Sequence, residues 1–305
     1  DLFTVVMLAG IYGLLSASFF VSMNAVDVAF TEAAVGAGIF PLLMLVTLSM
    51  TNRYERSSQR QPLRATVLVA TTGVLLLLGT LDMPAFGSAD APAHGHVAPR
   101  YIQQSGKEIG IDNIVTSVLA SYRAFDTLGE VVVIFTAGMG VVTLLMGMPC
   151  DDSKKNGERL PAMREHKILR VVGKILIAPI LLFALYVQFH GDYSPGGGFQ
   201  AGVIFASGVI LYSMLFGLSR ARKIIGQSAL RALAAIGILL YGSVGLLGLL
   251  TGKNFLDYNA LAGDPTAGQH LGILLIELGV GITVATVMVL IFFAFAGRVG
   301  NAHTD

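Results

Sequence analysis

The sequence predicts an all-α, polytopic integral membrane protein with about eight transmembrane helices and both termini in the cytoplasm. Three observations predict this class: an apolar composition, long apolar runs, and an uneven distribution of cationic residues between those runs. Hydrophobic residues make up 54% of the 305 residues, and charged residues only 13%. The mean hydropathy of +0.72 lies far above that of a soluble domain of this length.

The apolar runs have the length of membrane-spanning helices. Such a helix needs about 20 mostly apolar residues, and its backbone groups must bond to one another inside the bilayer. The first run is too long for a signal peptide and lacks its cationic flank, so we interpret it as a span. The expected spans cover residues 2–23, 33–50, 65–82, 129–148, 168–189, 199–218, 230–251 and 271–297.

Cationic residues indicate the orientation of these spans, because they are retained on the cytoplasmic side. The loops after spans two, four and six carry Arg53, Arg56, Arg60, Arg64, Lys154, Lys155, Arg159, Arg164, Lys167, Arg220, Arg222 and Lys223. The opposite side carries only Arg100, Lys107, Arg123 and Lys253. This asymmetry predicts a multi-pass protein of the cell membrane with both termini inside.

Composition divides the chain into four segments. Residues 1–83 form a three-helix segment, and residues 84–148 form a polar outer loop followed by one helix. Residues 149–167 form a charged cytoplasmic linker, which is the expected boundary between two modules. Residues 168–305 form a four-helix module.

The same composition excludes several classes of function. The single cysteine, Cys150, excludes a disulfide framework and an iron–sulfur cluster held by this chain alone. No phosphate-binding, dinucleotide-binding or nucleophile motif is present, so we expect no enzyme activity and no cofactor. The net charge of +1 is not gathered in a basic arm, so no nucleic-acid partner is expected. His94 and His96 stand two apart in the outer loop, a pattern that does not by itself predict a metal site.

Carboxylates near the ends of the spans are the main functional candidates, because a charge inside a bilayer is costly. Asp27 and Glu32 lie between the first two spans, at the expected outer boundary of the membrane. One interpretation is a proton or cation relay that leads into span two. The alternative is a hydrated turn whose acids favour the start of the next helix.

A second cluster precedes and enters the fourth span. Arg123, Asp126 and Glu130 stand at i, i+3 and i+7, which places them on one helix face with neighbours about 5–6 Å apart. A cation beside two acids forms a site that takes up and releases a proton. The alternative is a structural ion pair at the outer end of the span, because residues 131–148 are long enough to span without Glu130.

A third cluster joins spans five and six on the outer side. Pro195 is followed by Gly196, Gly197 and Gly198, which permit backbone conformations that let amides and carbonyls line a cavity. His190 precedes them, and a histidine, with an ordinary pKa of about 6.5, suits a proton shuttle. The alternative is a tight turn with a histidine at the membrane interface.

Two charges are expected deeper in the membrane. Lys174 lies inside span five, where it serves an ion path or extends its amine to the cytoplasmic surface. Glu277 lies inside span eight beside Gly279 and Gly281, which permit close helix approach, and it is a candidate gate or relay carboxylate. A longer, tilted helix would instead place Glu277 near the membrane rim.

Most of these candidates map to the outer half of the membrane, with Lys174 alone in the inner half. We therefore expect an acidic, hydrated vestibule on the outer side that concentrates cations or protons. The residues assigned to it are Asp27, Glu32, Asp126, Glu130, His190 and Glu277.

Three segments resemble components of known membrane complexes. DVAFTEAAVGAG, which begins at Asp27, resembles MbhD of membrane-bound hydrogenases and the matching C-terminal part of MrpA, the large Mrp antiporter protein. YRAFDTLGE, which ends at Glu130, resembles MbhE. HGDYSPGGGFQAG from His190, with IELGVGITV from Ile276, resembles MrpB of Mrp antiporters and its hydrogenase counterpart MbhF. Residues 1–83, 84–148 and 168–305 are accordingly similar to MbhD, MbhE and MrpB.

The resemblance implies a fused component of a multisubunit membrane complex related to complex I. Its partners would be other Mrp- or antiporter-like membrane subunits in a hetero-oligomer within the lipid bilayer. Mrp complexes exchange Na⁺ for H⁺, whereas the hydrogenase relatives couple hydrogen evolution to ion export. The chain lacks the large antiporter core with midspan lysines and broken helices, so we do not expect it to transport alone.

Three functional hypotheses follow. The leading one is a subunit of an Mrp-type monovalent cation (Na⁺)/proton antiporter that contributes an outer ion or proton pathway. The second is the same module in a redox-driven complex such as a membrane-bound hydrogenase, with all metal centres on other chains. The third is a scaffold whose acids are structural.

Overall fold

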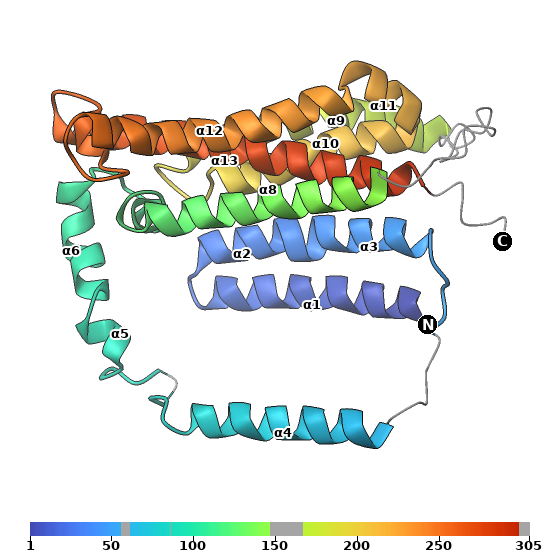
Figure 1. Cartoon of the computed structure of the whole chain (residues 1–305), viewed down its shortest axis with the longest axis horizontal. Coiled ribbons are helices and arrows are strands. Elements are labelled where there is room, and N and C mark those ends of the chain that lie inside the picture. Colours follow the sequence, from blue (N-terminus) through green and yellow to red (C-terminus); the bar gives the residue numbers. More distant parts are fainter. Residues whose placement is uncertain (56–61, 86, 147–166, 299–305) are drawn as a thin grey trace.

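The expected all-α membrane fold is confirmed. The computed structural model describes residues 1–55, 62–85, 87–146 and 167–298. Within these ranges the chain contains no strand, and 8 helical segments are long and apolar enough to cross a membrane (Figure 1). The expected linker 149–167 lies outside the described residues except for Lys167, and so does Cys150.

The N-terminal part supplies three spans. Helix α1 (Leu2–Ser22) packs against a second span made of α2 (Val26–Glu32), the π-helix η1 (Ala33–Ile39) and α3 (Phe40–Leu48). Glycines allow this close approach, because a Cβ atom built on Gly13 would lie 2.7 Å from the Gly36 carbonyl carbon. The third span, α4 (Pro62–Thr80), stands apart from the rest of the bundle (Figure 1).

The connection from α4 to the fourth span runs along one end of the molecule. It contains α5 (Pro92–Gly95), α6 (Ala98–Glu108), α7 (Ile114–Ser117) and the π-helix η2 (Val118–Tyr122), and it leads into α8 (Ala124–Met146). Helix α6 runs across the direction of the spans, so α5 and α6 bridge the distance between α4 and the other helices (Figure 1).

The C-terminal part is a four-span module with one short helix at each end. Its elements are α9 (Lys167–His190), α10 (Gly198–Phe216), α11 (Leu218–Ile224), α12 (Gln227–Leu250), the 3₁₀ turn η4 (Tyr258–Ala260) and α13 (Pro265–Ala296). The eight expected spans match these helices, and most of their ends agree within a few residues.

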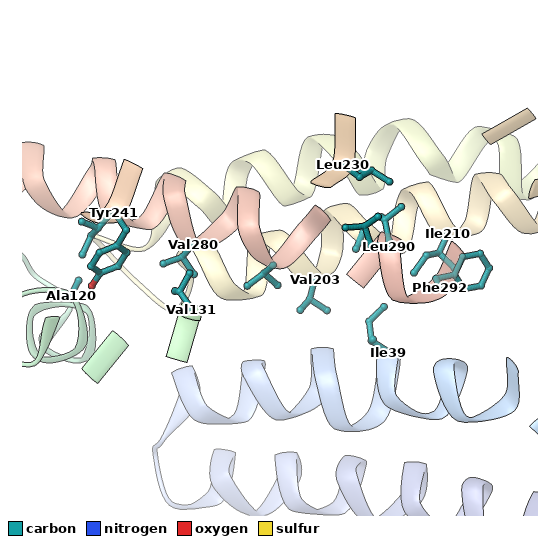
Figure 2. Close-up of a cluster of buried hydrophobic side chains, with 14 of the residues drawn as sticks. Ile39, Ala120, Val131, Val203, Ile210, Leu230, Tyr241, Val280, Leu290 and Phe292 are labelled. Atoms are coloured by element: carbon teal, nitrogen blue, oxygen red, sulfur yellow. The ribbon is translucent and has the colours of Figure 1, made fainter. Parts of the chain in front are cut away.

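Helix α13 is the centre of the fold, since it contacts α8, α9, α10 and α12 and is mostly buried. Its contacts are close because glycines face it from three helices. Cβ atoms built on Gly202 and Gly237 would lie 2.8 Å and 2.6 Å from carbonyl oxygens of α13, and one on Gly138 would lie 2.7 Å from Val287. Val280, Leu290 and Phe292 of α13 occupy the middle of the resulting apolar core (Figure 2).

The bundle has two distinct ends. Helix α1 begins and α13 ends at the same one, which we call the terminal end (Figure 1). The opposite one, which we call the loop end, holds the α9–α10 loop, η4 and helix α6 (Figure 1). The described cations of the second and sixth interhelical loops lie at the terminal end, as the even number of spans requires.

Two boundaries differ from the expectation. Asp27 and Glu32 lie within the helix of the second span, rather than in a turn before it. Helical structure also begins well before the fourth span, at Ile114, and it breaks at Arg123, whose φ and ψ of −121° and 31° are not helical. Hydropathy missed both features because the polar residues of these segments face a cavity and a neighbouring loop rather than lipid.

Candidate functional site

A cavity lies at the loop end of the bundle, and its volume is about 610 Å³. Most of its wall is apolar, but three carboxylates from three separate spans line it: Asp27 of α2, Glu130 of α8 and Glu277 of α13. The remaining polar wall consists of Thr31, Thr116, Thr127, Gln200 and the main chain of Gly196, Gly197 and Gly198.

Asp27 is held in the cavity wall by the segment before α7. Asn113 caps α7, and its amide nitrogen Nδ2 lies 3.4 Å from Asp27 Oδ1 and 3.1 Å from the carbonyl oxygen of Ser194. The main chain of Gly196 also makes a hydrogen bond with the Asp27 carboxylate. Asn113 and Gly196 therefore join three parts of the chain, α2, α7 and the α9–α10 loop, at this carboxylate.

Glu277 faces the glycine-rich α9–α10 loop. A Cβ atom built on Gly197 would lie 2.9 Å from Glu277 Oε1, and one on Gly191 would lie 3.1 Å from Oε2. Gly197 has φ 111° and ψ 179°, a conformation that is nearly restricted to glycine. The loop backbone thus lies directly against the carboxylate, and in the part of the chain that the structure describes no cation forms an ion pair with Glu277.

Glu130 lies where the cavity opens. It lines the cavity, yet its side chain is exposed on the surface of the bundle. Among residues 1–55, 62–85, 87–146 and 167–298 it forms no ion pair. Glu130 therefore connects the interior of the cavity with whatever covers this face of α8 in the membrane.

Hydrogen bonds extend from Asp27 along one wall of the cavity. The buried Gln200 donates from Nε2 to Thr31 Oγ1 at 2.9 Å, and Thr31 Oγ1 donates to the main-chain oxygen of Asp27 at 3.0 Å. The π-helix η1 begins one residue beyond Glu32, and π-helical turns occur frequently at functional sites. This wall is therefore polar and internally bonded along its length.

Two buried tyrosines hold the break at the start of α8. The hydroxyl of Tyr241 donates to the Ala124 oxygen at 2.7 Å, and that of Tyr258 donates to the Ala120 oxygen at 2.9 Å. Both rings are fully buried, and Figure 2 shows the Tyr241 hydroxyl directed toward the segment that contains Ala120. They supply donors to carbonyls beside the π-helix η2, and so they fix the start of the helix that carries Glu130.

The structure places the other predicted residues outside the cavity wall. Arg123 pairs with Asp126, with Nε 2.6 Å from Oδ2, and both side chains are exposed. The ring of His190 stacks on Tyr186 at 4.7 Å between centroids. The Glu32 carboxylate lies over Gly36, one turn beyond the cavity residues of α2. Lys174 is exposed on α9 and forms no ion pair with another described residue.

Other residues of the site were not predicted from the sequence. Asn113, Gln200 and Thr31 are ordinary polar residues, and only their three-dimensional contacts reveal their role. Pro195 was predicted to shape the loop, and the three glycines after it do line the cavity. His270 and Asp192 also belong to this end of the bundle, with Nδ1 and Oδ2 3.5 Å apart. The spacing of His270 and Glu277 on one helix was the available signal.

Comparison with protein families divides the chain into three parts. Residues 168–290 match the family described as a domain related to the MnhB subunit of Na⁺/H⁺ antiporters. Residues 1–53 match MbhD, the D subunit of the membrane-bound hydrogenase family MBH, and residues 69–159 match MbhE, its E subunit.

Individual relatives agree with this division. A putative antiporter subunit mnhB2 of Staphylococcus haemolyticus is 34% identical over 44% of this chain and 98% of its own length. The A/B subunit of a probable K⁺/H⁺ antiporter of Rhizobium meliloti is 27% identical over 97% of this chain. The chain covers only 32% of that relative, or about a third of its length.

Two solved structures share the fold. A chain of the Mrp complex from Dietzia sp. DQ12-45-1b superposes with a TM-score of 0.75 and 24% identity over 98% of this chain and 32% of its own length. A chain of the membrane-bound sulfane sulfur reductase, an archaeal respiratory complex, has a TM-score of 0.58 and 30% identity over 75% of this chain and 95% of its own.

Proposed function

Because the chain belongs to the MnhB family of antiporter subunits, with segments of the MbhD and MbhE families ahead of the MnhB part, we propose that it is a membrane subunit of an Mrp-type cation/proton antiporter. Its partners are other antiporter-like membrane subunits, and its cargo is a monovalent cation, Na⁺, exchanged for H⁺. The chain contributes part of the ion or proton pathway rather than a complete transporter.

The observation that carries this proposal is the cavity with Asp27, Glu130 and Glu277 in its wall. Three carboxylates from separate helices in a mostly apolar space attract cations or protons and repel anions. Glu277 faces loop backbone and Glu130 has no ion pair among the described residues, so neither carboxylate is neutralised as a structural ion pair would be.

The positive-inside rule supports an outer position for this site. Arg53, Arg220 and Lys223 belong to loops at the terminal end, so that end faces the cytoplasm and the loop end faces outward. The cavity then opens the pathway on the outer half of the membrane. Asp126, Glu32, His190 and Lys174 stay predictions as members of the same pathway.

Neutralisation of the carboxylates in the assembled complex tests the proposal. Glu277→Gln, Glu130→Gln and the double variant would be assayed in membrane vesicles for proton movement after addition of Na⁺ or K⁺. We expect the double variant to lose exchange while the complex still assembles, and Asp90→Asn, in an exposed turn, to exchange normally. Normal exchange by the double variant would reject the pathway and leave the scaffold function.

The likeness to the sulfane sulfur reductase complex supports a second candidate function. In that case the same module would be driven by a redox reaction on partner chains rather than by a cation gradient. Purification of the tagged chain in mild detergent, followed by mass spectrometry, separates the two. Stoichiometric iron–sulfur or nickel subunits would support the redox complex, whereas antiporter-like subunits without metalloproteins would support the antiporter.

A further inference from the structure

A histidine–carboxylate pair lies at the loop end, just above the cavity. His270 of α13 has Nδ1 3.5 Å from Asp192 Oδ2 and Nε2 3.0 Å from the carbonyl oxygen of Gly110. The side chains of His270 and Asp192 are 41% and 25% exposed, so the pair contacts the solution at this end. With Nε2 donating its proton to Gly110, Nδ1 is the nitrogen that is free to gain or lose a proton toward Asp192.

The main chain around this pair is firmly anchored. The Asp192 oxygen accepts from the Asn113 amide at 3.1 Å, and Thr116 Oγ1 donates to the Gly191 oxygen at 2.7 Å. Asn113 also contacts the Asp27 carboxylate in the cavity wall. The same short segment therefore positions the exposed pair and one of the cavity carboxylates.

Only one residue separates the exposed pair from the buried carboxylate. Asp192 follows Gly191, and the Cα of Gly191 lies against Glu277, since a Cβ atom built there would be 3.1 Å from Oε2. His270 and Glu277 stand at i and i+7 on α13, which places them on one face about 10 Å apart along the helix axis. The charged side chain that contacts His270 within the described ranges is Asp192, and Glu277 follows on its own helix.

We propose that His270, held by Asp192 and Gly110, is the proton-exchanging residue between the outer solution and Glu277. This inference rests on the proposed pathway through the cavity and adds a further residue to it. Asp192 is the positioning partner that fixes the ring and faces the nitrogen that carries the exchanged proton. Histidine suits the role because its ordinary pKa of about 6.5 lets it exchange protons at neutral pH.

The transfer conserves protons at each step. The imidazolium of His270 gives one proton, through water at the cavity entrance, to the Glu277 carboxylate and becomes neutral. A proton from the outer solution then restores the imidazolium. The reverse order releases a proton from Glu277 to the outside, so one residue serves both directions of exchange.

The test compares His270→Asn with His94→Asn in the purified complex reconstituted into proteoliposomes. An asparagine amide can still donate to the Gly110 oxygen but does not titrate, so it retains the structural contact and removes the proton transfer. His94 is an exposed histidine of α5 at the same end and serves as the matched control. Cation-driven proton exchange would be measured as a function of the pH on the outer side, together with the melting temperature of each complex.

We expect His270→Asn to assemble and melt like the wild type but to exchange about tenfold or more slowly near neutral pH. His94→Asn should behave as the wild type, and added imidazole should restore part of the rate of His270→Ala. Asp192→Asn should change the pH profile, because the imidazolium then lacks its anionic neighbour.

Three outcomes would overturn the inference. A wild-type rate and pH profile for His270→Asn would show that the histidine only anchors Gly110. Equal losses in His270→Asn and His270→Ala with a lower melting temperature and no response to imidazole would show the same. Normal exchange in His270→Asn with loss in Glu277→Gln rejects the relay alone, whereas normal exchange in Glu277→Gln rejects the pathway and the relay together.

Discussion

Replacement of Gly197 by alanine separates the backbone role of the glycine-rich loop from its role at the site. Gly197 combines a conformation nearly restricted to glycine, φ 111° and ψ 179°, with direct contact to Glu277. An alanine methyl there would lie 2.9 Å from Oε1 and 3.2 Å from Oε2. The nearest atoms are the end of a flexible side chain, so the carboxylate moves away rather than the helix.

Two effects are therefore expected, and they differ in kind. The backbone strain should lower the stability of the folded chain by about 1–3 kcal/mol. The displaced carboxylate should slow exchange beyond what this loss of stability explains, by about tenfold or more if Glu277 acts in proton transfer.

Two control variants isolate the effects. Gly252 has φ 77° with no other atom within 4 Å of a built Cβ, so Gly252→Ala adds strain without touching the site. Gly191→Ala adds a methyl 3.1 Å from Glu277 Oε2 at a position where φ is not in the left-handed region. Thermal unfolding of the complex and exchange in vesicles would be measured for all three. Equal exchange rates in Gly197→Ala and Gly252→Ala, at similar stability, would refute the role assigned to the contact.

Further predictions concern the supports of the site. Tyr241→Phe should cost about 1–3 kcal/mol of stability, because it leaves the Ala124 carbonyl without its buried donor, and thermal unfolding of the complex measures this; an unchanged melting temperature would contradict it. Gly237→Val should prevent stable assembly, since its Cβ would overlap Thr283 Oγ1, whereas Gly242→Val on the same helix meets no atom within 4 Å; equal yields of both complexes would reject this packing argument. The Tyr122 hydroxyl donates to Glu108 and lowers the pKa of that carboxyl, while burial, aided by Glu108, raises the pKa of Tyr122 to about 12. The bond should therefore be complete from above the ordinary carboxyl pKa to about pH 10, weaken as the pH falls through the lowered pKa of Glu108 or rises toward 12, and delay phenolate formation relative to Tyr122→Phe controls in an absorbance titration.

Much of the fold could be predicted because membrane spans have a strong and simple signal. Apolar runs such as 271–297 need only length and composition to be recognised, and α13 indeed occupies Pro265–Ala296. The cationic loops predict the orientation by the same kind of one-dimensional count. The glycines after Pro195 were also predictable as cavity-lining residues, because three consecutive glycines leave backbone groups uncovered.

The arrangement of the site could not be predicted, because it depends on contacts between distant segments. Glu130 and Asp126 stand one turn apart on α8, yet only Glu130 lines the cavity, since Arg123 sits in a helix break and pairs with Asp126 at the surface. No local pattern reveals that Tyr241 satisfies Ala124, more than a hundred residues away. Polar residues such as Asn113 gain their role only from the loop that folds over them.

The length of α13 has an electrical consequence. Its 32 residues measure about 48 Å, whereas the hydrocarbon core of a bilayer is about 30 Å thick. About 28 Å of helix separates Glu277 from Ala296, which places the carboxylate near the outer boundary of that core. A charge that reaches Glu277 from the loop end has therefore crossed little of the membrane voltage. Most of the roughly 2.3 kcal/mol per charge at 100 mV acts on the inner leg of the pathway, so membrane potential should govern steps toward the cytoplasm more than proton exchange with the outside.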